Sequence, residues 1–412
     1  MNPDSLTLPF RKRKELSPME DTLIRRLQKD LPLTLQPPRI PRAEETAHPV
    51  SLEHPWGTYF LSCGIAGTRR GRIWSLWSGN EDGPCGCLML ARSDDEGRTW
   101  SPPQLVLEAR RTPGGFPLSN KNGALWCDPE GGLWLFFSQS LGYFDGRSGV
   151  WAVRCADPDA ETPEWGEPSR LWHGVPLNKP CVRRNGEWVL PLSLGIRRFA
   201  SFDGESLPDS LFAELDSLRG AHVLVSSDSG RSWERRGFQN CTDPTFYENH
   251  VLEKQNGVLK MYARDRWGIL SAESSDEGWH WTPFRREFCS VSARFHVSRL
   301  PSGNWLMLRY DTDDLADDPD RRKNITAFLS EDEGGTWRGG LLLDGREKVS
   351  YPDAFVHPDG RIFTQHDYLR KDGCLVLSVF REEDVLAGRP VTDAVRLGVF
   401  FPSRLTGDCL TV

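Results

Sequence analysis

Long apolar runs are missing from this chain of 412 residues. No stretch approaches the roughly 18 consecutive apolar residues that a membrane-spanning helix requires. Acidic residues outnumber basic ones, 58 to 51, and this balance argues against a nucleic-acid partner, which would need a basic face. Phosphate-loop, dinucleotide and zinc-protease motifs are missing too, and the nine histidines show no ligand spacing. We therefore expect no metal, cofactor, nucleic-acid or membrane partner.

The N-terminus lacks the apolar segment and small-residue cleavage site of a secretory signal. The expected localisation is therefore cytoplasmic. In a chain of this length without a signal, we expect the ten cysteines to be free core thiols rather than disulfides. Cys85-x-Cys87 is interpreted as two thiols on one strand face, not as a metal pair.

Residues 1–50 differ from the rest and are assigned to an N-terminal leader. Ser17 is a candidate N-cap, and apolar side chains then recur on one face as far as Asp30. This pattern predicts a short amphipathic helix, and the prolines that follow predict an extended segment. Residues 51–412 are assigned to a single all-β domain.

One phrase recurs six times along that domain: an apolar strand, a glycine turn and a second apolar strand. Its turn glycines are Gly71, Gly132, Gly186, Gly257, Gly303 and Gly360. Intervals of roughly 50 residues, with space for two more strands per phrase, are typical of propeller blades. The sequence therefore predicts a six-bladed β-propeller of four-stranded antiparallel blades.

A second phrase, Ser-x-Asp-x-Gly-x-(Ser/Thr/His)-Trp, occurs four times, beginning at Ser93, Ser226, Ser274 and Ser330. Asp and Ser can hydrogen-bond within a tight turn, Gly takes a left-handed position and Trp fills the gap between sheets. We assign these boxes a structural role. Together with the hairpin repeat, they resemble the Asp-box (BNR-repeat) propellers of the sialidase, or neuraminidase, superfamily.

Propeller geometry predicts which residues meet at one mouth of the axis, because first strands start where second strands end. The first-strand starts are Gly64, Lys121 or Asn122, Lys179, Glu248, Arg294 and Tyr351. The second-strand ends are Asp82, the segment 138–139, Arg197 or Arg198, Arg264, Asp311 and Asp367. So many charged groups at one ring favour a functional site there.

The resemblance to sialidases implies roles for some of these residues. It implies that Tyr351, which opens the last blade, is the nucleophile and that Asp82, with Glu81 as the fallback, is the acid/base. Glu248 matches the glutamate that would take the proton of the tyrosine. A tyrosine nucleophile is the recognised exception among glycosidases.

The resemblance also implies substrate-binding residues. Arg264 follows Glu248 across its hairpin, Arg322 precedes the last Asp box and Asp367 closes the final hairpin. Two arginines can hold a carboxylate with bidentate, charge-assisted hydrogen bonds. Arg294 and Lys179 are additional candidates for this clamp.

The first clamp arginine of sialidases, in an Arg-Ile-Pro phrase, has no counterpart at the expected place, where Gly64 stands. The chain does contain Arg39-Ile40-Pro41, but this phrase lies too early for the hairpin and is interpreted as part of the leader. The substrate of this chain is therefore left open between sialic acid and other sugars.

The resulting functional prediction is a retaining exo-glycosidase for a terminal acidic sugar, sialic acid or a related ulosonic acid. The alternatives are a glycosidase or lyase for uronic-acid or rhamnose linkages, and a non-catalytic carbohydrate-binding propeller. In each case the expected partner is a carbohydrate.

Overall fold

The computed structural model describes residues 18–41, 57–195, 201–202, 205–206, 211–241, 244–312 and 318–401. Helix α1 (Pro18–Asp30) falls within the predicted helical segment. The extended segment expected next begins instead with a short 3-10 helix, η1 (Leu31–Leu35). The carboxylate of Asp30, at this junction, accepts the N–H of Gly114 at 3.0 Å and so ties the leader to blade 2.

The described strands form six antiparallel blades, numbered here along the chain, and the predicted six-bladed β-propeller is confirmed. Blade 1 contains β1 (Leu61–Gly67), β2 (Ile73–Ser78), β3 (Leu88–Ser93) and β4 (Leu105–Leu107). Blade 2 contains β5 (Arg110–Arg111), β6 (Pro117–Cys127), β7 (Leu133–Leu141), β8 (Gly149–Cys155) and β9 (Ser169–Trp172). Blade 3 contains β10 (Cys181–Val182), β11 (Trp188–Leu194), β14 (Gly220–Ser226) and β15 (Glu234–Gln239).

The remaining blades follow the same order. Blade 4 contains β16 (Pro244–Glu253), β17 (Leu259–Asp265), β18 (Gly268–Ser274) and β19 (Arg285–Cys289). Blade 5 contains β20 (His296–Arg299), β21 (Trp305–Tyr310), β22 (Ile325–Ser330) and β23 (Arg338–Asp344). Blade 6 contains β24 (Val349–Val356), β25 (Ile362–Tyr368), β26 (Cys374–Phe380) and β27 (Arg396–Phe401). Between them lie the pair β12 (Ser201–Phe202) and β13 (Glu205–Ser206), the 3-10 helices η3 (Ala213–Leu218) and η4 (Pro319–Arg321), and helix α2 (Glu382–Ala387).

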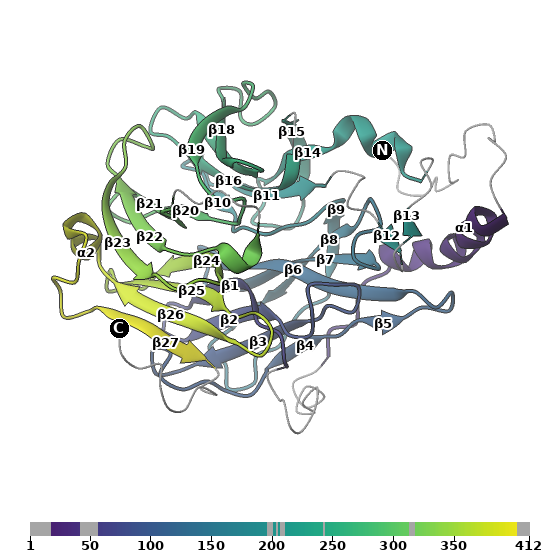
Figure 1. Cartoon of the computed structure of the whole chain (residues 1–412), viewed down its shortest axis with the longest axis horizontal. Helices are drawn as coiled ribbons and strands as arrows, with labels where there is room; N and C mark the ends of the chain where they lie inside the picture. Colours follow the sequence, from purple (N-terminus) through teal and green to yellow (C-terminus); the bar gives the residue numbers. More distant parts are fainter. Residues whose placement is uncertain are drawn as a thin grey trace.

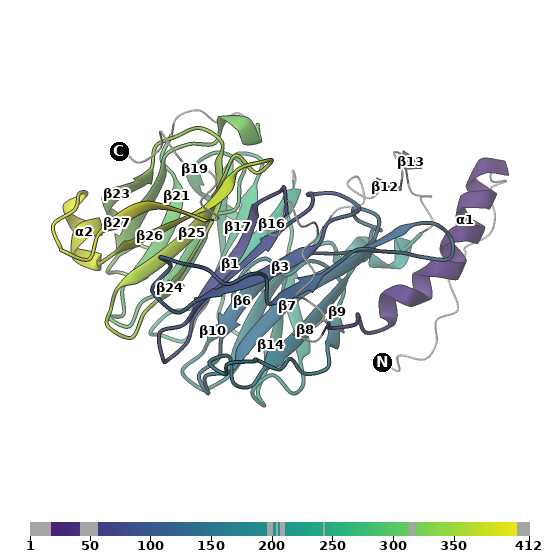
Figure 2. The ribbon, with the colours of Figure 1, turned by 90° about the horizontal axis from the view of Figure 1, so that it is seen from below.

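The blades follow one another around the ring, and β24–β27 lie beside β1–β4 (Figure 1). Helix α1 lies at the rim near blade 2, and α2 lies at the outer edge of blades 5 and 6 (Figures 1 and 2). Every strand of blade 6 comes from the C-terminal part of the chain, so none of the described strands is shared between the first and last blades. Ring closure therefore depends on contacts between blades 6 and 1.

The hydrophobic core is divided among the interfaces between neighbouring blades. Each such interface contains its own cluster of buried side chains, such as Trp134, Leu190 and Leu224 between blades 2 and 3. This division explains why the strands are apolar on both faces, because each blade has a neighbour on either side. Burial of these faces is the main stabilising contribution to the fold.

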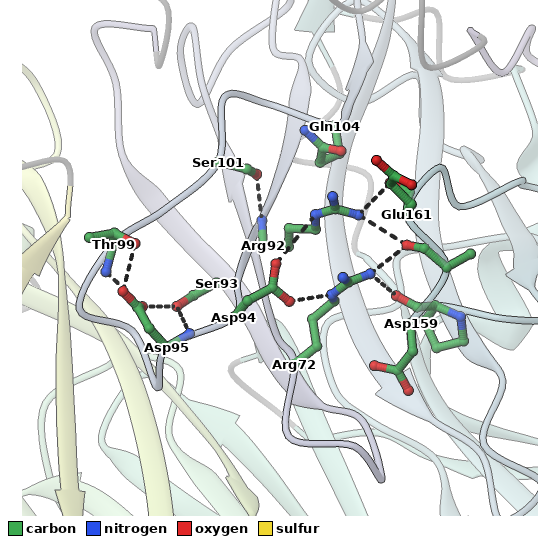
Figure 3. Close-up of polar contacts among 12 residues, drawn as sticks. Arg72, Arg92, Ser93, Asp94, Asp95, Thr99, Ser101, Gln104, Asp159 and Glu161 are labelled. Atoms are coloured by element: carbon green, nitrogen blue, oxygen red, sulfur yellow. Dashed lines mark hydrogen bonds and ion pairs between the residues drawn. The ribbon is translucent and has the colours of Figure 1, made fainter.

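The four predicted Asp boxes form turns between the third and fourth strands of blades 1, 3, 4 and 5. In the first box, Ser93 Oγ donates to Asp95 Oδ1 at 2.8 Å, and the N–H of Thr99 donates to the same oxygen at 2.8 Å (Figure 3). Next to it, Arg72 pairs with Asp94 at 2.6 Å and donates to the carbonyls of Pro158 and Ala160 of blade 2. The box therefore closes its own turn, while its neighbours connect two blades.

The left-handed turn glycine of blade 2 is Gly131 (φ 98°), not Gly132 as predicted. The nine cysteines among the described residues are free thiols, as expected, but Cys289 is exposed and not in the core. Within the described part of the chain, no helix is long and apolar enough to cross a membrane.

Substitutions at two glycines distinguish the cost of backbone strain from the cost of steric crowding. A Cβ added at Gly186 (φ 89°) would meet open space, whereas a Cβ on Gly334 (φ 80°) would lie 2.1 Å from Tyr262 Oη. We expect Gly186→Ala to cost about 1–2 kcal/mol of unfolding free energy from strain alone. Gly334→Ala should cost about 1–3 kcal/mol more, because the core must move as well. Urea unfolding of both variants measures this difference, and equal losses would contradict the packing of the fourth box against blade 4.

Candidate active site

Four inner strands, β1, β6, β16 and β24, contain an irregularity in their pairing with the second strand of the blade. Three of these irregularities, in β6, β16 and β24, involve residues with unusual backbones. The residues there, Asn122 (φ 49°), Glu248 (φ 43°) and Tyr351 (φ 56°), have left-handed backbones. Such bulges redirect side chains and are unfavourable for non-glycine residues unless the surroundings hold them. They set the directions of two of the predicted catalytic side chains.

Tyr351 and Glu248 are in direct contact. The Tyr351 hydroxyl donates to Glu248 Oε1 at 2.7 Å, and Arg264 Nη1 lies 2.9 Å from the same oxygen. All three side chains are buried, with 8%, 1% and 7% of their residue surfaces exposed. A carboxylate in this position can accept the phenol proton. The structure thus brings together three residues from blades 4 and 6 that the sequence analysis grouped.

The phenol of Tyr351 is held in its neutral form. Burial and the Glu248 carboxylate raise its pKa well above the ordinary value of 10, and Arg264, Arg370 and Arg322 only partly oppose them. Desolvation is therefore the largest effect on this pKa. Tyr351 can therefore act as a nucleophile only if its proton moves to Glu248 during attack.

Arg322 lies beside the Tyr351 ring. Its guanidinium carbon is 5.8 Å from the Tyr351 ring centre, and it donates to Ser350 Oγ at 3.1 Å and to the Ser292 carbonyl at 2.9 Å. Among the described residues, no carboxylate lies within 4 Å of this arginine. Arg264 Nε also donates to Ser292, at 3.1 Å, so the two predicted clamp arginines share one neighbour. Arg322 is a buried cation that an anionic ligand could neutralise.

The sequence analysis missed Arg370, which follows the second strand of blade 6. Its guanidinium lies 4.4 Å from the Tyr351 ring centre, within cation–π distance. Its Nε donates to Asp367 Oδ1 at 3.1 Å, and Asp367 Oδ2 accepts the N–H of Ser62 at 3.0 Å. The third arginine at this site thus comes from the last blade and not from the first. The available signal was its position three residues after Asp367, in the loop that leaves the same strand.

Asp82 lies at the open side of the site. Its side chain is 28% exposed, and one of its oxygens is 4.0 Å from Arg370 Nη1. The fallback residue, Glu81, instead binds the backbone of its own loop, since Glu81 Oε1 accepts the N–H of Cys85 at 2.6 Å. This arrangement favours Asp82 over Glu81 for contact with a ligand.

Lys121 faces the same loop from blade 2. Its ammonium group lies 3.5 Å from the ring centre of Tyr143 and 3.4 Å from the carbonyl of Gly83. Only 3% of the residue is exposed. Burial lowers its pKa to about 7, although Asp82, Glu81 and Asp145 favour the charged form. The sequence analysis placed Lys121 at the mouth but gave it no role.

The other two candidate clamp residues, Lys179 and Arg294, lie beside a carboxylate of the protein itself, Asp353. Lys179 Nζ lies 2.5 Å from Asp353 Oδ2, and Arg294 Nη2 lies 3.8 Å from Asp353 Oδ1. Lys179 also lines a cavity of about 490 Å³ formed where the inner strands end, at the mouth opposite Tyr351. Their role in binding substrate stays a prediction, and the structure places them deeper along the axis than Arg264 and Arg322.

Neighbouring atoms of Asp353 and Leu125 fill the space beside Gly64. A Cβ there would lie 3.2 Å from Asp353 Oδ2 and 3.2 Å from the backbone nitrogen of Leu125, so an arginine does not fit. Gly64 lies beyond the irregularity of β1, which shifts the register between Ser62 and Gly64 and places Gly64 below the mouth. Arg39 is exposed, and the neighbouring Ile40 packs partly against the cluster between blades 1 and 2. Arg197 and Arg198 lie outside the described residues.

Comparison with known proteins gives a family and several similar folds. Residues 72–364 match the family described as BNR repeat-like domain. A Hadza microbial sialidase is similar over 80% of this chain and 67% of its own, with 19% identity and a TM-score of 0.60. NanB sialidase from Streptococcus pneumoniae is similar over 81% and 70%, with 11% identity and a TM-score of 0.59. An α-L-arabinofuranosidase from Fusarium graminearum is similar over 79% and 94%, with 10% identity and a TM-score of 0.52. No curated protein matches the sequence.

The buried lysine at the mouth gives a pH-dependent prediction. Lys121 loses its proton at about pH 7 when folded, but near 10.5 in the unfolded chain. The cost of burying its charge is therefore fully present below pH 7 and fades as the pH rises toward 10. We expect Lys121→Met to be more stable than the wild type at about pH 6, with an advantage that shrinks as the pH rises.

Urea unfolding across this pH range measures the effect. The matched control is Lys254→Met, because Lys254 pairs with Glu273 at 2.5 Å near the surface. A stability difference between Lys121→Met and the wild type that does not change with pH would contradict the buried, easily neutralised lysine.

Proposed function

The chain belongs to the family of BNR repeat-like domains, and we propose that it is a retaining exo-glycosidase that hydrolyses a terminal acidic sugar, sialic acid or a related ulosonic acid. The family and the sialidase-like neighbours support a glycosidase-type propeller. Because fold alone does not define an activity, the substrate and the mechanism are argued from the site.

The observation that carries the proposal is the Tyr351–Glu248 contact of 2.7 Å within a group of three arginines. A neutral phenol can approach an anionic sugar without the repulsion that a carboxylate nucleophile would meet. Its neutral form is favoured by burial, and the carboxylate that must accept its proton is already hydrogen-bonded to it. This arrangement suits an anionic substrate better than a neutral one.

The charges around Tyr351 also support an acidic substrate. Glu248 pairs with Arg264, and Asp367 pairs with Arg370, so these four charges compensate one another. Arg322 has no carboxylate partner among the described residues. A substrate carboxylate beside Arg322 would receive charge-assisted hydrogen bonds in a largely water-free site.

The proposed reaction has two displacements. In the first, the Tyr351 oxygen bonds to the anomeric carbon as its proton passes to Glu248, and Asp82 protonates the departing glycosidic oxygen. In the second, ionised Asp82 takes a proton from water, the water oxygen bonds to the anomeric carbon and Tyr351 leaves with the proton from Glu248. Two inversions retain the configuration of the sugar.

Hydrolysis of an aryl α-ketoside of sialic acid, with proton NMR of the first anomer released, tests this proposal. We expect the retained anomer, and a loss of at least about 1,000-fold in kcat for Tyr351→Phe, which removes only the nucleophilic oxygen. The control is Tyr262→Phe, because the buried hydroxyl of Tyr262 has no hydrogen-bond partner among the described residues. Release of the inverted anomer, or no turnover across a panel of ulosonides, would overturn the proposal.

The variant Arg322→Met tests separately whether the substrate carries a carboxylate that the site binds. If Arg322 binds the substrate carboxylate, losing that bond should cost about 1.5–3 kcal/mol, or roughly 10- to 100-fold in kcat/KM. The same substrate with its carboxylate converted to an amide should be affected much less. Arg309→Met is the control, since Arg309 lies in the same blade but pairs with Asp311 and covers the Phe328 ring. Equal losses on both substrates would mean that Arg322 does not bind the carboxylate.

A glycosidase for another sugar is the second candidate. It is favoured by the different origin of the third arginine, which comes from blade 6 and is already paired with Asp367. One structural neighbour, from Fusarium graminearum, is an α-L-arabinofuranosidase. Cleavage of uronic-acid or rhamnose-containing fragments, with sialosides left intact, would favour this alternative. Sugar binding without any turnover would favour a binding module.

A further inference from the structure

A buried carboxylate, Asp353, connects four blades at the axis directly beneath the candidate active site. It lies in β24, two residues beyond Tyr351, and is 1% exposed. Its Oδ2 is 2.5 Å from Lys179 Nζ of blade 3 and accepts the N–H of Ile65 of blade 1 at 2.9 Å. Its Oδ1 is 3.0 Å from His296 Nδ1 of blade 5. Lys179 also donates to the carbonyl of Ala354, at 2.6 Å, so the strand beyond Tyr351 is held at two points.

Arg294 and Asn178 extend these contacts from Asp353 to β16, the strand that contains Glu248. Arg294 is fully buried, with its guanidinium 6.0 Å from the Tyr351 ring centre and 3.8 Å from Asp353. Its Nε donates to Asn178 Oδ1 at 2.9 Å. The Asn178 amide nitrogen in turn donates to the carbonyls of Glu248 at 2.8 Å and Asn249 at 3.0 Å. Asn178 therefore holds the backbone at the irregularity that directs Glu248.

We infer that Asn178 and Asp353, linked through Arg294 and Lys179, are positioning residues that hold the left-handed backbones of Glu248 and Tyr351 in the orientation in which their side chains meet. The inference rests on the proposed function, since it gives that contact a role in turnover. Lys179 and Arg294, which the sequence predicted as substrate ligands, act in this proposal on protein groups. We call the set Asn178, Lys179, Arg294 and Asp353 the axial network.

The physical reason lies in the backbone at the two irregularities. Left-handed conformations are unfavourable for Glu and Tyr, and a ladder shifted by one residue leaves carbonyl groups without strand partners. The Asn178 amide satisfies two such carbonyls in β16. Asp353 fixes the position at which the regular pairing of β24 with β25 resumes, opposite Gln365. Both irregularities are then fixed from below by groups outside the contact of Glu248 with Tyr351.

The charge of the network does not depend on a ligand. Burial by itself would raise the pKa of Asp353, but Lys179, His296 and Arg294 together hold this pKa far below its usual range. An ionised Asp353 can therefore keep both cations in place when the site above it is empty. This property suits a support that exists before substrate binds.

The decisive variant is Asn178→Asp. It keeps the oxygen that accepts from Arg294 Nε, so the cation stays paired, but it replaces the two donated hydrogen bonds with repulsion against two carbonyls. We expect kcat to fall about 10- to 100-fold while KM changes less than about 3-fold and the melting temperature changes little. Ser193→Ala is the matched control. Ser193 donates to the side chain of Asn249, which neighbours Glu248 in β16, at 3.3 Å, but Ser193 does not belong to the axial network. An unchanged kcat in folded Asn178→Asp overturns the inference.

A second pair of variants tests the Asp353 end. Lys179→Met should lower kcat in the same way, and Lys179→Arg should recover part of it, because the arginine restores a cation beside Asp353. If Lys179 only stabilised the fold, Lys179→Met would have a lower melting temperature, but its folded fraction would keep the wild-type kcat. That result would also overturn the inference.

Crystal structures of Asn178→Asp and the wild type provide a readout that does not depend on the substrate. We expect the 2.7 Å contact between Tyr351 Oη and Glu248 Oε1 to be lost or lengthened in the variant. If that contact stays below about 3 Å, positioning by Asn178 is wrong whatever the enzyme acts on. If the contact changes but the wild type turns over no sugar, the proposed function fails while the support of the two irregularities stands.

Discussion

The closure of the ring between blade 6 and blade 1 is the constraint on which the site depends. None of the described strands is shared there, and the two blades are joined by apolar clusters and by buried polar side chains. Asp367 accepts the N–H of Ser62 at 3.0 Å, and Gln365 Nε2 donates to Ser62 Oγ at 3.2 Å and to the Gly64 carbonyl at 3.3 Å. At the mouth, the N–H of Phe60 donates to the Arg370 carbonyl at 2.7 Å. Of these hydrogen bonds, the one to the Asp367 carboxylate involves a charged group, and such bonds contribute about 1.5–3 kcal/mol.

The same closure also positions a charged side chain at the candidate active site. Because the backbone of Arg370 is paired with blade 1, its side chain is directed back over Tyr351 and toward Asp367. The last blade therefore supplies the candidate nucleophile, one cation beside it and the carboxylate that holds this cation. A propeller closed by a shared strand would fix its ends by backbone pairing and would not need these side chains for closure.

Apolar and polar groups are separated radially in this fold. The interfaces between blades are largely hydrophobic, whereas the axis contains buried Arg264, Arg294 and Arg322 and the partly buried Lys179 with their partners. Burying such charges is expensive, and apolar groups of similar size would often stabilise a protein as well or better. Their concentration where the inner strands converge therefore indicates binding and catalysis more than stability. The raised pKa of Tyr351 is one result of this dry, charged environment.

The sequence by itself determined the six-bladed propeller, the Asp boxes and the grouping of Tyr351 with Glu248, Arg264 and Arg322. These features follow from local patterns: each strand and turn has its own signature, and the repeat order brings equivalent positions to one mouth. The tertiary structure decided which residues point into the site. Side chains alternate along a strand, so one extra residue at an irregularity reverses the facing of all that follow, and the sequence does not mark where it occurs. For that reason Gly64 lies below the mouth. Lys179 and Arg294 instead precede the regularly paired strands β10 and β20 and lie near Asp353, and the place of Arg370 over Tyr351 is set by a contact between the two ends of the ring.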